Sequence, residues 1–279
     1  MFCVNCGNKI EDGDKFCTNC GTPINSSDIT GENATGSNNN VGHEDLSIQI
    51  NNAKCVKEYS EDTTVEGFDT VKFGSYPQSD ATGNKKDPIE WIVLEKGNGK
   101  ALLLSKYILD CKCYNNVYAE ISWEKCDLRK WLNNSFLNTA FSKNEQEKIA
   151  KIIIKNNDNP KFKDGKGGED TEDKVFLLSI EECMKYLDGI KDETNVDLKI
   201  NKHLLTIGTK YAKEVDNNGE KLSIYGGDDD GYECSCFYLR TPGMYNFEVC
   251  EVSSIGDLDL SGSHVDFIDG VRPALWVTY

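Results

Sequence analysis

The chain has 279 residues, and 31 Lys and Arg against 47 Asp and Glu give a formal net charge of −16 at pH 7. Hydrophobic residues make up 38% and aromatic residues 10%, which is enough for a folded core and excludes a wholly disordered chain. The charge disfavours nucleic acids and anionic membranes as partners, because their phosphate groups would be repelled. No apolar run approaches the roughly 20 residues of a membrane span.

Cysteine usage indicates a reducing location. The sequence holds twelve cysteines, but the chain is too long for a small disulfide scaffold. Its first residues, MFCVNCGNKI, lack the basic region and apolar stretch of a secretory signal peptide. We therefore predict reduced thiols and a cytoplasmic protein.

Residues 1–24 carry two C-x-x-C-G motifs, formed by Cys3 with Cys6 and by Cys17 with Cys20. Four thiolates complete the tetrahedral shell of zinc and leave no open position, which is typical of a structural ion. A unit of this size has almost no core, so the metal must supply its folding free energy. The pattern resembles bacterial zinc ribbons and predicts one structural Zn²⁺.

Residues 25–64 are rich in Ser, Asn, Gly, Thr and acids, which predicts a flexible linker. From residue 65 to 279 the pattern is that of a folded α+β domain. Strands are expected at 71–73, 89–94 and 101–104, the last two joined by a five-residue loop over 96–100. Further strands are expected at 152–154 and 175–178, and in short segments after residue 231.

Three helices and a short capped one are expected between these strands. Ser122 is the predicted N-cap of a helix through Leu132. The pattern S-x-x-E occurs at Ser142 and at Ser179, and it predicts two helices that begin with capping boxes. A further helix is expected over 204–215.

Arginine is scarce, with Arg129, Arg240 and Arg272 as the whole set. Where lysine is the default base, an arginine indicates a position that needs a planar, bidentate donor. Arg240 and Arg272 precede prolines near the C-terminus. They are either scaffold residues that tie turn carbonyls or carboxylates, or ligand contacts that capture an anion.

The segment between these two arginines is rich in aromatic, amide and carboxylate groups, which suit recognition by short loops. Solvated β-turns are the alternative interpretation. The candidate ligand-binding residues are Arg240, Tyr245, Asn246, Glu248, His264, Asp266 and Arg272.

Five phrases in the large domain, in order, carry a family resemblance: FGSYPQ at 73–78, PIEW at 88–91, DLRKWLN at 127–133, LRTPG at 239–243 and GVRPAL at 270–275. Together they resemble a bacterial family of uncharacterised domains that often follow zinc ribbons. That family is similar to the C-type-lectin-like fold of formylglycine-generating enzymes. The resemblance implies a mixed scaffold with a ligand-facing surface near its C-terminus. The family has no established activity that could be carried over to this chain.

No catalytic constellation stands out. Cys234 and Cys236 are candidate reactive thiols for a cysteine-dependent oxidoreductase, but inert thiols are the simpler interpretation. Asp228, Asp229 and Asp230 lie in a glycine loop without the spacing of a calcium site. The leading hypothesis is a non-catalytic protein whose C-terminal loops recognise a protein or a glycan, and a docking component of a larger assembly is a further alternative.

The zinc site yields the first prediction. Replacing Cys17 with Ser removes one of four ligands, so the ribbon should lose its zinc and its fold. Zinc per chain, measured by elemental analysis of the full-length protein, should fall from one to near zero. The matched variant Cys55→Ser should keep one zinc. A ribbon whose amide NMR signals stay dispersed after chelation would contradict the metal's structural role.

Overall fold

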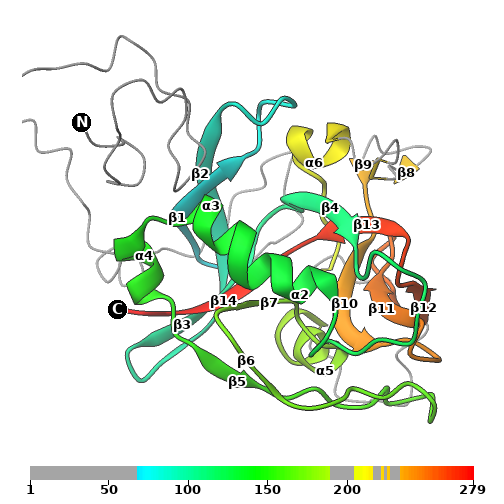
Figure 1. Ribbon diagram of the computed structural model, residues 1–279. Helices are drawn as coiled ribbons and strands as arrows, with labels where there is room; N and C mark the ends of the chain where they lie inside the picture. The colour runs from blue at the N-terminus through cyan, green and yellow to red at the C-terminus, as the bar shows by residue number, and fades with distance from the viewer. Residues whose placement is uncertain (1–67, 189–203, 216–220, 223–224, 227–232) are drawn as a thin grey trace, which may run out of the picture. The chain divides into compact units, whose positions relative to one another are not determined.

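The structure is a computed structural model that describes residues 68–188, 204–215, 221–222, 225–226 and 233–279. Its helical segments are α2 (Asp127–Trp131), the π-helical turn η1 (Leu132–Phe136), α3 (Leu137–Ala140), α4 (Lys143–Lys148), α5 (Ile180–Cys183), the π-helical turn η2 (Met184–Asp188) and α6 (Lys210–Glu214). Its strands are β1 (Thr70–Pro77), β2 (Lys86–Gly97), β3 (Lys100–Ser105), β4 (Asp110–Cys113), β5 (Ile152–Ile154), β6 (Thr171–Asp173), β7 (Val175–Phe176), β8 (Tyr225–Gly226), β9 (Glu233–Cys234), β10 (Phe237–Pro242), β11 (Glu248–Val252), β12 (Leu258–His264), β13 (Ile268–Val271) and β14 (Ala274–Thr278). The α+β prediction is confirmed, with strands toward both ends of the described chain and helices toward its middle (Figure 1).

The first sheet joins the beginning of the described chain to its end. Its strand order is β1-β2-β3-β14-β7, and every neighbouring pair is antiparallel. Apolar side chains from this sheet enter the core, among them the fully buried Trp91. The indole Nε1 of Trp91 donates to the carbonyl of Phe73 at 2.7 Å, which satisfies its polar atom inside the core.

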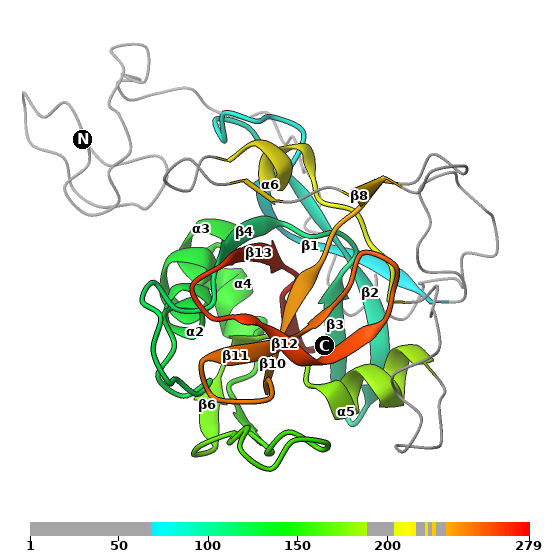
Figure 2. The ribbon, with the colours of Figure 1, turned by 90° about the vertical axis from the view of Figure 1, so that its right-hand side faces the viewer.

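The second sheet has the order β12-β11-β10-β13-β4. Strands β10 and β13 pair in parallel, and the other neighbours are antiparallel. Strand β4 comes from the N-terminal half, and its residues Asp110–Cys113 pair with Ile268–Val271. This pairing brings the loop after β4 to the β12–β13 turn, as both views of the ribbon show (Figures 1 and 2).

The chain crosses from the second sheet to the first at Arg272 and Pro273, between β13 and β14. The carbonyl of Pro273 accepts from the Ser105 amide at 2.9 Å, and the Arg272 Nε donates to the Ser105 carbonyl at 3.0 Å. Pro273 fixes φ and has no amide that would need a partner there. The end of β3 therefore holds the crossing from both sides.

A continuous helical run, α2-η1-α3, lies in front of β14 and β7 in the view of Figure 1. The side chain of Asn133 ties this run to β7. Its Nδ2 donates to the Val175 carbonyl at 2.8 Å, and its Oδ1 accepts from the Lys174 amide at 2.9 Å. The predicted N-cap is wrong: α2 is capped by Cys126, whose Sγ accepts from the Arg129 amide. Ser122 instead accepts backbone bonds from the turn that precedes the helix. None of the described helices is long and apolar enough to cross a membrane.

Both predicted capping boxes are confirmed. Ser142 accepts from the Glu145 amide while the Glu145 carboxylate accepts from the Ser142 amide, and α4 begins there. Ser179 and Glu182 form the same reciprocal pair at the start of α5. The S-x-x-E pattern locates both helix starts because the bonds it makes are local.

The predicted five-residue loop between β2 and β3 is wrong. The strands continue to Gly97 and from Lys100, and Asn98 and Gly99 form a two-residue turn. Both turn residues have positive φ, 52° and 69°, as the hairpin turn that matches strand twist requires. Asn-Gly is the preferred sequence for such a turn. The lysines at 96 and 100 made the whole segment resemble a longer polar loop.

The helix expected over 204–215 is shorter, because α6 spans Lys210–Glu214. The first half of the predicted helix is bonded to another segment instead. The Ile207 carbonyl accepts from the Ile108 amide, and the Thr209 amide donates to the Ile108 carbonyl. This parallel bridge needs extended backbone, so the helix begins after Thr209, whose hydroxyl caps the Ala212 amide.

Asn159 fastens the loop between β5 and β6 to the second sheet. Its side chain is buried, and its Nδ2 lies 2.8 Å from the carbonyl oxygens of Pro242 and Leu260. Its Oδ1 accepts from the amides of Lys161 and Phe162. One side-chain amide thus binds carbonyls and amides from three backbone segments, and Cys250 Sγ is a second donor to both carbonyls.

Replacing Asn159 with Ala should lower the free energy of unfolding by roughly 2–3 kcal/mol. The backbone carbonyls and amides that it binds would each lose a hydrogen bond. Urea unfolding followed by circular dichroism measures this change. The matched variant Asn138→Ala removes an exposed amide on α3 and should change stability by less than about 0.5 kcal/mol. Equal effects of the two variants would show that Asn159 is no anchor.

Candidate ligand-binding surface

Arg240 is a scaffold residue. Its side chain is 5% exposed, and its guanidinium makes a two-point pair with the Glu182 carboxylate. It also donates to the carbonyls of Leu177, at 2.7 Å, and Lys155, at 3.3 Å. These bonds join β10 to α5, to the residue after β5 and to the residue after β7. The guanidinium is therefore engaged inside the protein, and the ligand-contact interpretation of Arg240 is not supported.

Arg272 is buried more deeply still, at 1% exposure. Its Nε and Nη1 donate to the carbonyls of Ser105 and Leu204, and its guanidinium lies over the Phe237 ring at 5.2 Å. No described carboxylate forms an ion pair with it, and burial lowers its pKa to about 10. A surface ligand cannot reach this group, so Arg272 also acts in the scaffold.

Arg129 has the same kind of role. It donates to Asp173 through Nε and Nη2, each at 2.7 Å, and Trp123 Nε1 donates to the other oxygen of that carboxylate at 3.0 Å. The scarcity of arginine thus marks three positions that need a planar donor, as expected, and all three are structural.

Five rings form a continuous aromatic strip on the surface of the second sheet. In order, its members are Tyr245, Phe247, Tyr118, His264 and Phe267. Ring centroids along this order are 5.4, 5.6, 5.0 and 4.9 Å apart. Each ring therefore touches the next, although the residues come from three separate segments of the chain.

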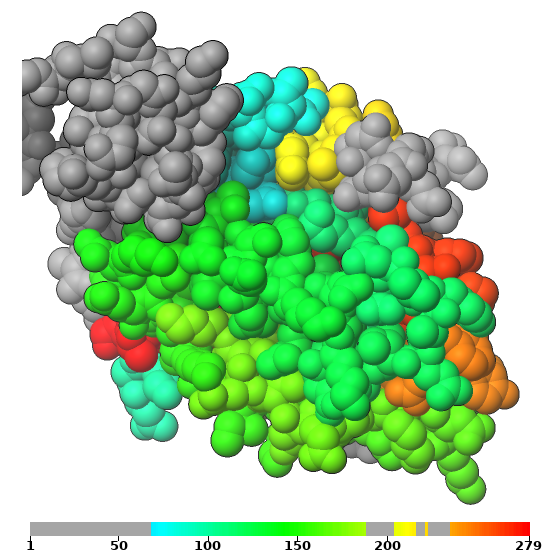
Figure 3. Space-filling model, in the orientation of Figure 1, coloured from blue at the N-terminus to red at the C-terminus, as the bar shows by residue number. Residues whose placement is uncertain are grey.

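The strip is open to solvent. Tyr118 is 51% exposed, Phe267 55% and Tyr245 41%, and Val117 beside the strip is 65% exposed. Phe247 and His264 are half-buried between them. Scattered exposed apolar residues are common, but a contiguous row of ring faces is typical of an interaction surface. In Figure 3 the β4–α2 loop meets atoms of the C-terminal strands at the right-hand edge of the molecule.

Hydrogen bonds at both ends of the β4–α2 loop fix the loop that carries Tyr118. The Asn115 amide donates to the Val265 carbonyl at 2.7 Å, and the Ile121 amide donates to the Asn246 carbonyl at 2.8 Å. The Asn115 side chain also donates to the Val117 carbonyl at 2.8 Å. The loop is thereby fastened to the same two turns that carry the other four rings.

The turn over 244–248 presents Tyr245 and Phe247. Glu248 closes it, because its amide donates to the Tyr245 carbonyl and its carboxylate accepts from the Tyr245 amide. The Asn246 side chain donates to the Lys166 carbonyl at 2.7 Å and accepts from the Lys166 amide at 2.9 Å. The side-chain amide of Asn246 is therefore hydrogen-bonded to the neighbouring loop. Its predicted contact with a ligand has no support in this geometry.

The turn after β12 presents His264 and Phe267. The hydroxyl of the buried Tyr238 lies 3.2 Å from the His264 carbonyl and 2.8 Å from the Phe267 carbonyl. The Asp266 carbonyl accepts from Cys113 Sγ at 3.1 Å. Strands β10 and β4 thus support this turn from below and fix the direction of its two rings.

Two members of the strip, Tyr245 and His264, were predicted from the sequence as site residues. Tyr118, Phe247 and Phe267 were not. Phe247 and Phe267 lie within the candidate segment but were not singled out among its residues. Tyr118 lies about 130 residues earlier, in the polar loop NNVYAE, and an exposed Val-Tyr pair there was the available signal.

Four of the described cysteines have raised pKa values. Burial, with the charges of Asp269 and Glu251, raises the pKa of the half-buried Cys236 to about 12. Burial also raises the pKa of Cys126 to about 12, and that of Cys183 and Cys250 further. These groups are thiols at neutral pH, not nucleophilic thiolates. The side chain of Cys234 lies outside the described part of the chain.

Glu251 and Asp269 form a carboxyl pair across the second sheet. Burial raises the pKa of both groups, and their mutual charge raises that of Asp269 further. Asp259, opposite Glu251 on β12, adds to the repulsion, while the Gly270 amide donates to Asp269 at 2.7 Å. Burial and like charge therefore both favour the protonated forms of these two carboxyl groups.

The described residues contain no group of three or more His, Cys, Asp or Glu side chains that suits a metal ion. The predicted zinc ligands Cys3, Cys6, Cys17 and Cys20, and the acidic loop Asp228–Asp230, lie outside the described part of the chain.

Comparison with protein families assigns both parts of the chain. A model described as a zinc-ribbon domain matches residues 2–24, and a model described as a domain of unknown function (DUF6273) matches residues 98–279. No curated protein and no solved structure matches the chain. The first match supports a zinc-binding module at the N-terminus. Neither match bears on the C-type-lectin-like fold, which stays a prediction.

The carboxyl pair yields a pH prediction. Groups whose pKa is raised by folding stabilise the protein below the pKa of the unfolded chain, and this stability is lost as pH rises through the raised values. Unfolding free energy should therefore fall between about pH 5 and pH 8. Glu251→Gln removes one charge, and at pH 8 it should raise stability by about 1 kcal/mol and flatten this slope.

Urea titrations across that pH range measure the effect. Glu172→Gln, at an exposed carboxylate paired with Lys151, is the matched control and should keep the wild-type slope. A wild-type stability that does not fall with pH, or a Glu251→Gln variant that is less stable at pH 8, would contradict the raised pKa values of these two carboxyl groups.

Proposed function

We propose that this chain, which belongs to the DUF6273 family, is a non-catalytic, zinc-containing binding protein that contacts a protein or glycan through its aromatic strip. The strip carries the proposal, because its five rings touch one another in a row, with Tyr118, Tyr245 and Phe267 exposed and the other two half-buried between them. Burying such faces releases water and supplies binding free energy, and Tyr and Phe lose little conformational entropy when they bind.

The support beneath the rings favours binding further. Hydrogen bonds at 2.7–2.8 Å fasten the Tyr118 loop to both turns, and Tyr238 holds the third segment. A surface that is already arranged before binding avoids the entropy of ordering its loops. The C-type-lectin-like fold, as a scaffold that presents variable loops, is part of this proposal.

The N-terminal part adds a second contact. In this proposal one structural Zn²⁺ on Cys3, Cys6, Cys17 and Cys20 folds the ribbon, which docks to a protein in the cytoplasm of a bacterium. A linker over 25–64 would raise the local concentration of either module near the partner of the other. The oxidoreductase alternative is weaker, because the Cys236 thiol is protonated at neutral pH.

The test compares the full-length wild type with a Tyr118→Ala/Phe247→Ala double variant on glycan and peptide arrays. Ligands held by the wild type should bind the variant at least about tenfold more weakly, since aromatic residues dominate contact energies. Ile153→Ala removes an exposed apolar side chain on β5 and should keep wild-type binding. Thermal melts should coincide for all three proteins.

Two results would contradict the proposal. One is a set of ligands that bind the double variant as well as the wild type. The other is the lack of any ligand on both arrays.

A further inference from the structure

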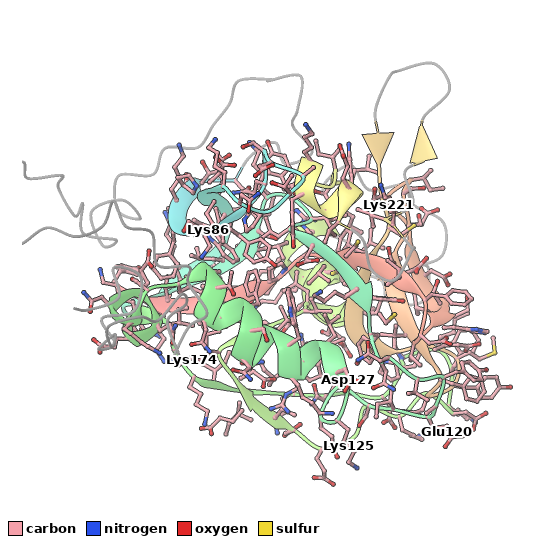
Figure 4. All side chains as sticks on the ribbon, turned by 45° about the horizontal axis from the view of Figure 1, so that its top comes forward. Lys86, Glu120, Lys125, Asp127, Lys174 and Lys221 are labelled. Atoms are coloured by element: carbon pink, nitrogen blue, oxygen red, sulfur yellow. The ribbon has the colours of Figure 1, made fainter. Side chains whose placement is uncertain are left out.

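The loops that carry the strip are acidic and contain no lysine or arginine. They span 114–121, 244–248 and 263–268, and their charged residues are Glu120, Glu248 and Asp266. None of these three carboxylates has a described lysine or arginine within ion-pair distance. Figure 4 places Glu120 on the outside of the molecule, on the loop that also carries Tyr118. The rings thus stand among uncompensated negative charges.

The lysines nearest to these loops along the chain, or in contact with them, are already engaged. Lys166 contacts Asn246 through its backbone, but its ammonium lies 2.8 Å from Asp158. Lys125 pairs with Glu124 at 2.7 Å. Lys112 lies over the Trp131 ring, 4.7 Å from its centroid, and 3.8 Å from Asp110. No described cation therefore occupies the ring faces or the carboxylates of the strip.

Exposed ring faces and carboxylates without a neighbouring lysine or arginine attract the same kind of group. The face of a Tyr or Phe ring is negative, and it stabilises an ammonium or guanidinium placed over it. Carboxylates accept hydrogen bonds from the edge of a guanidinium while its plane stacks on a ring.

We infer that the partner of the aromatic strip is a basic protein segment, whose Arg or Lys side chains stack on the rings and pair with Glu120, Glu248 and Asp266. This inference rests on the proposed binding function and narrows it. A net charge of −16 also favours a cationic partner over a second copy of this chain or a nucleic acid, because both of those would be repelled.

The test uses a fluorescein-labelled (Gly-Arg)₆ peptide and the full-length protein, with affinity measured by fluorescence anisotropy. Its matched probe replaces every arginine with citrulline, which keeps the shape and removes the charge. The arginine peptide should bind at least about tenfold more tightly than the citrulline peptide, and its affinity should fall between 50 and 300 mM NaCl.

Variants separate the strip from the bulk charge of the protein. Tyr118→Ala should weaken the arginine peptide about tenfold, and Glu120→Gln about threefold. Ile153→Ala and Glu172→Gln change an apolar side chain and a carboxylate on β5 and β6, and both should bind as the wild type does.

The inference is overturned if the citrulline peptide binds equally well, if neither peptide binds, or if Tyr118→Ala has no more effect than Ile153→Ala. A neutral glycan or peptide that needs Tyr118 and Phe247 on the arrays would then leave the binding function standing without a basic partner.

Discussion

The pairing of β4 with β13 is the constraint on which the candidate site depends. Strand β13 is held between two neighbours, and directly after it the chain crosses to the first sheet at Arg272. That crossing is fixed by a buried guanidinium bonded to the carbonyls of Ser105 and Leu204. With β13 fixed, Ile268 lies opposite Cys113, and the turn that carries His264 and Phe267 must meet the loop that carries Tyr118.

This arrangement separates the groups that hold the surface from those that face outward. Buried polar side chains such as Tyr238 and Asn159, together with backbone amides at the loop ends, fix the three segments. The rings above them make no side-chain hydrogen bond to any described residue that a ligand would have to break. Binding energy therefore comes from ring faces and nearby carboxylates, while the polar network beneath supplies the geometry.

Much of the fold was predictable because its signals are local. Capping boxes at Ser142 and Ser179, strand alternation and the α+β order all depend on residues a few positions apart. The roles of Arg240 and Arg272 were not predictable, since a scarce arginine suits a buried carbonyl as well as a ligand. The strip was only partly visible, because Tyr118 meets His264 through strand register, which the sequence pattern does not reveal.

The most direct measurement of the central claim is NMR of the full-length protein with ¹³C-labelled aromatic rings, titrated with the (Gly-Arg)₆ peptide. If the peptide binds at the strip, we expect saturable shifts of the Tyr118, Phe247 and Phe267 ring signals. The signal of the buried Trp91 ring should not change. Ring signals of the strip that stay still while signals elsewhere move would contradict the central claim.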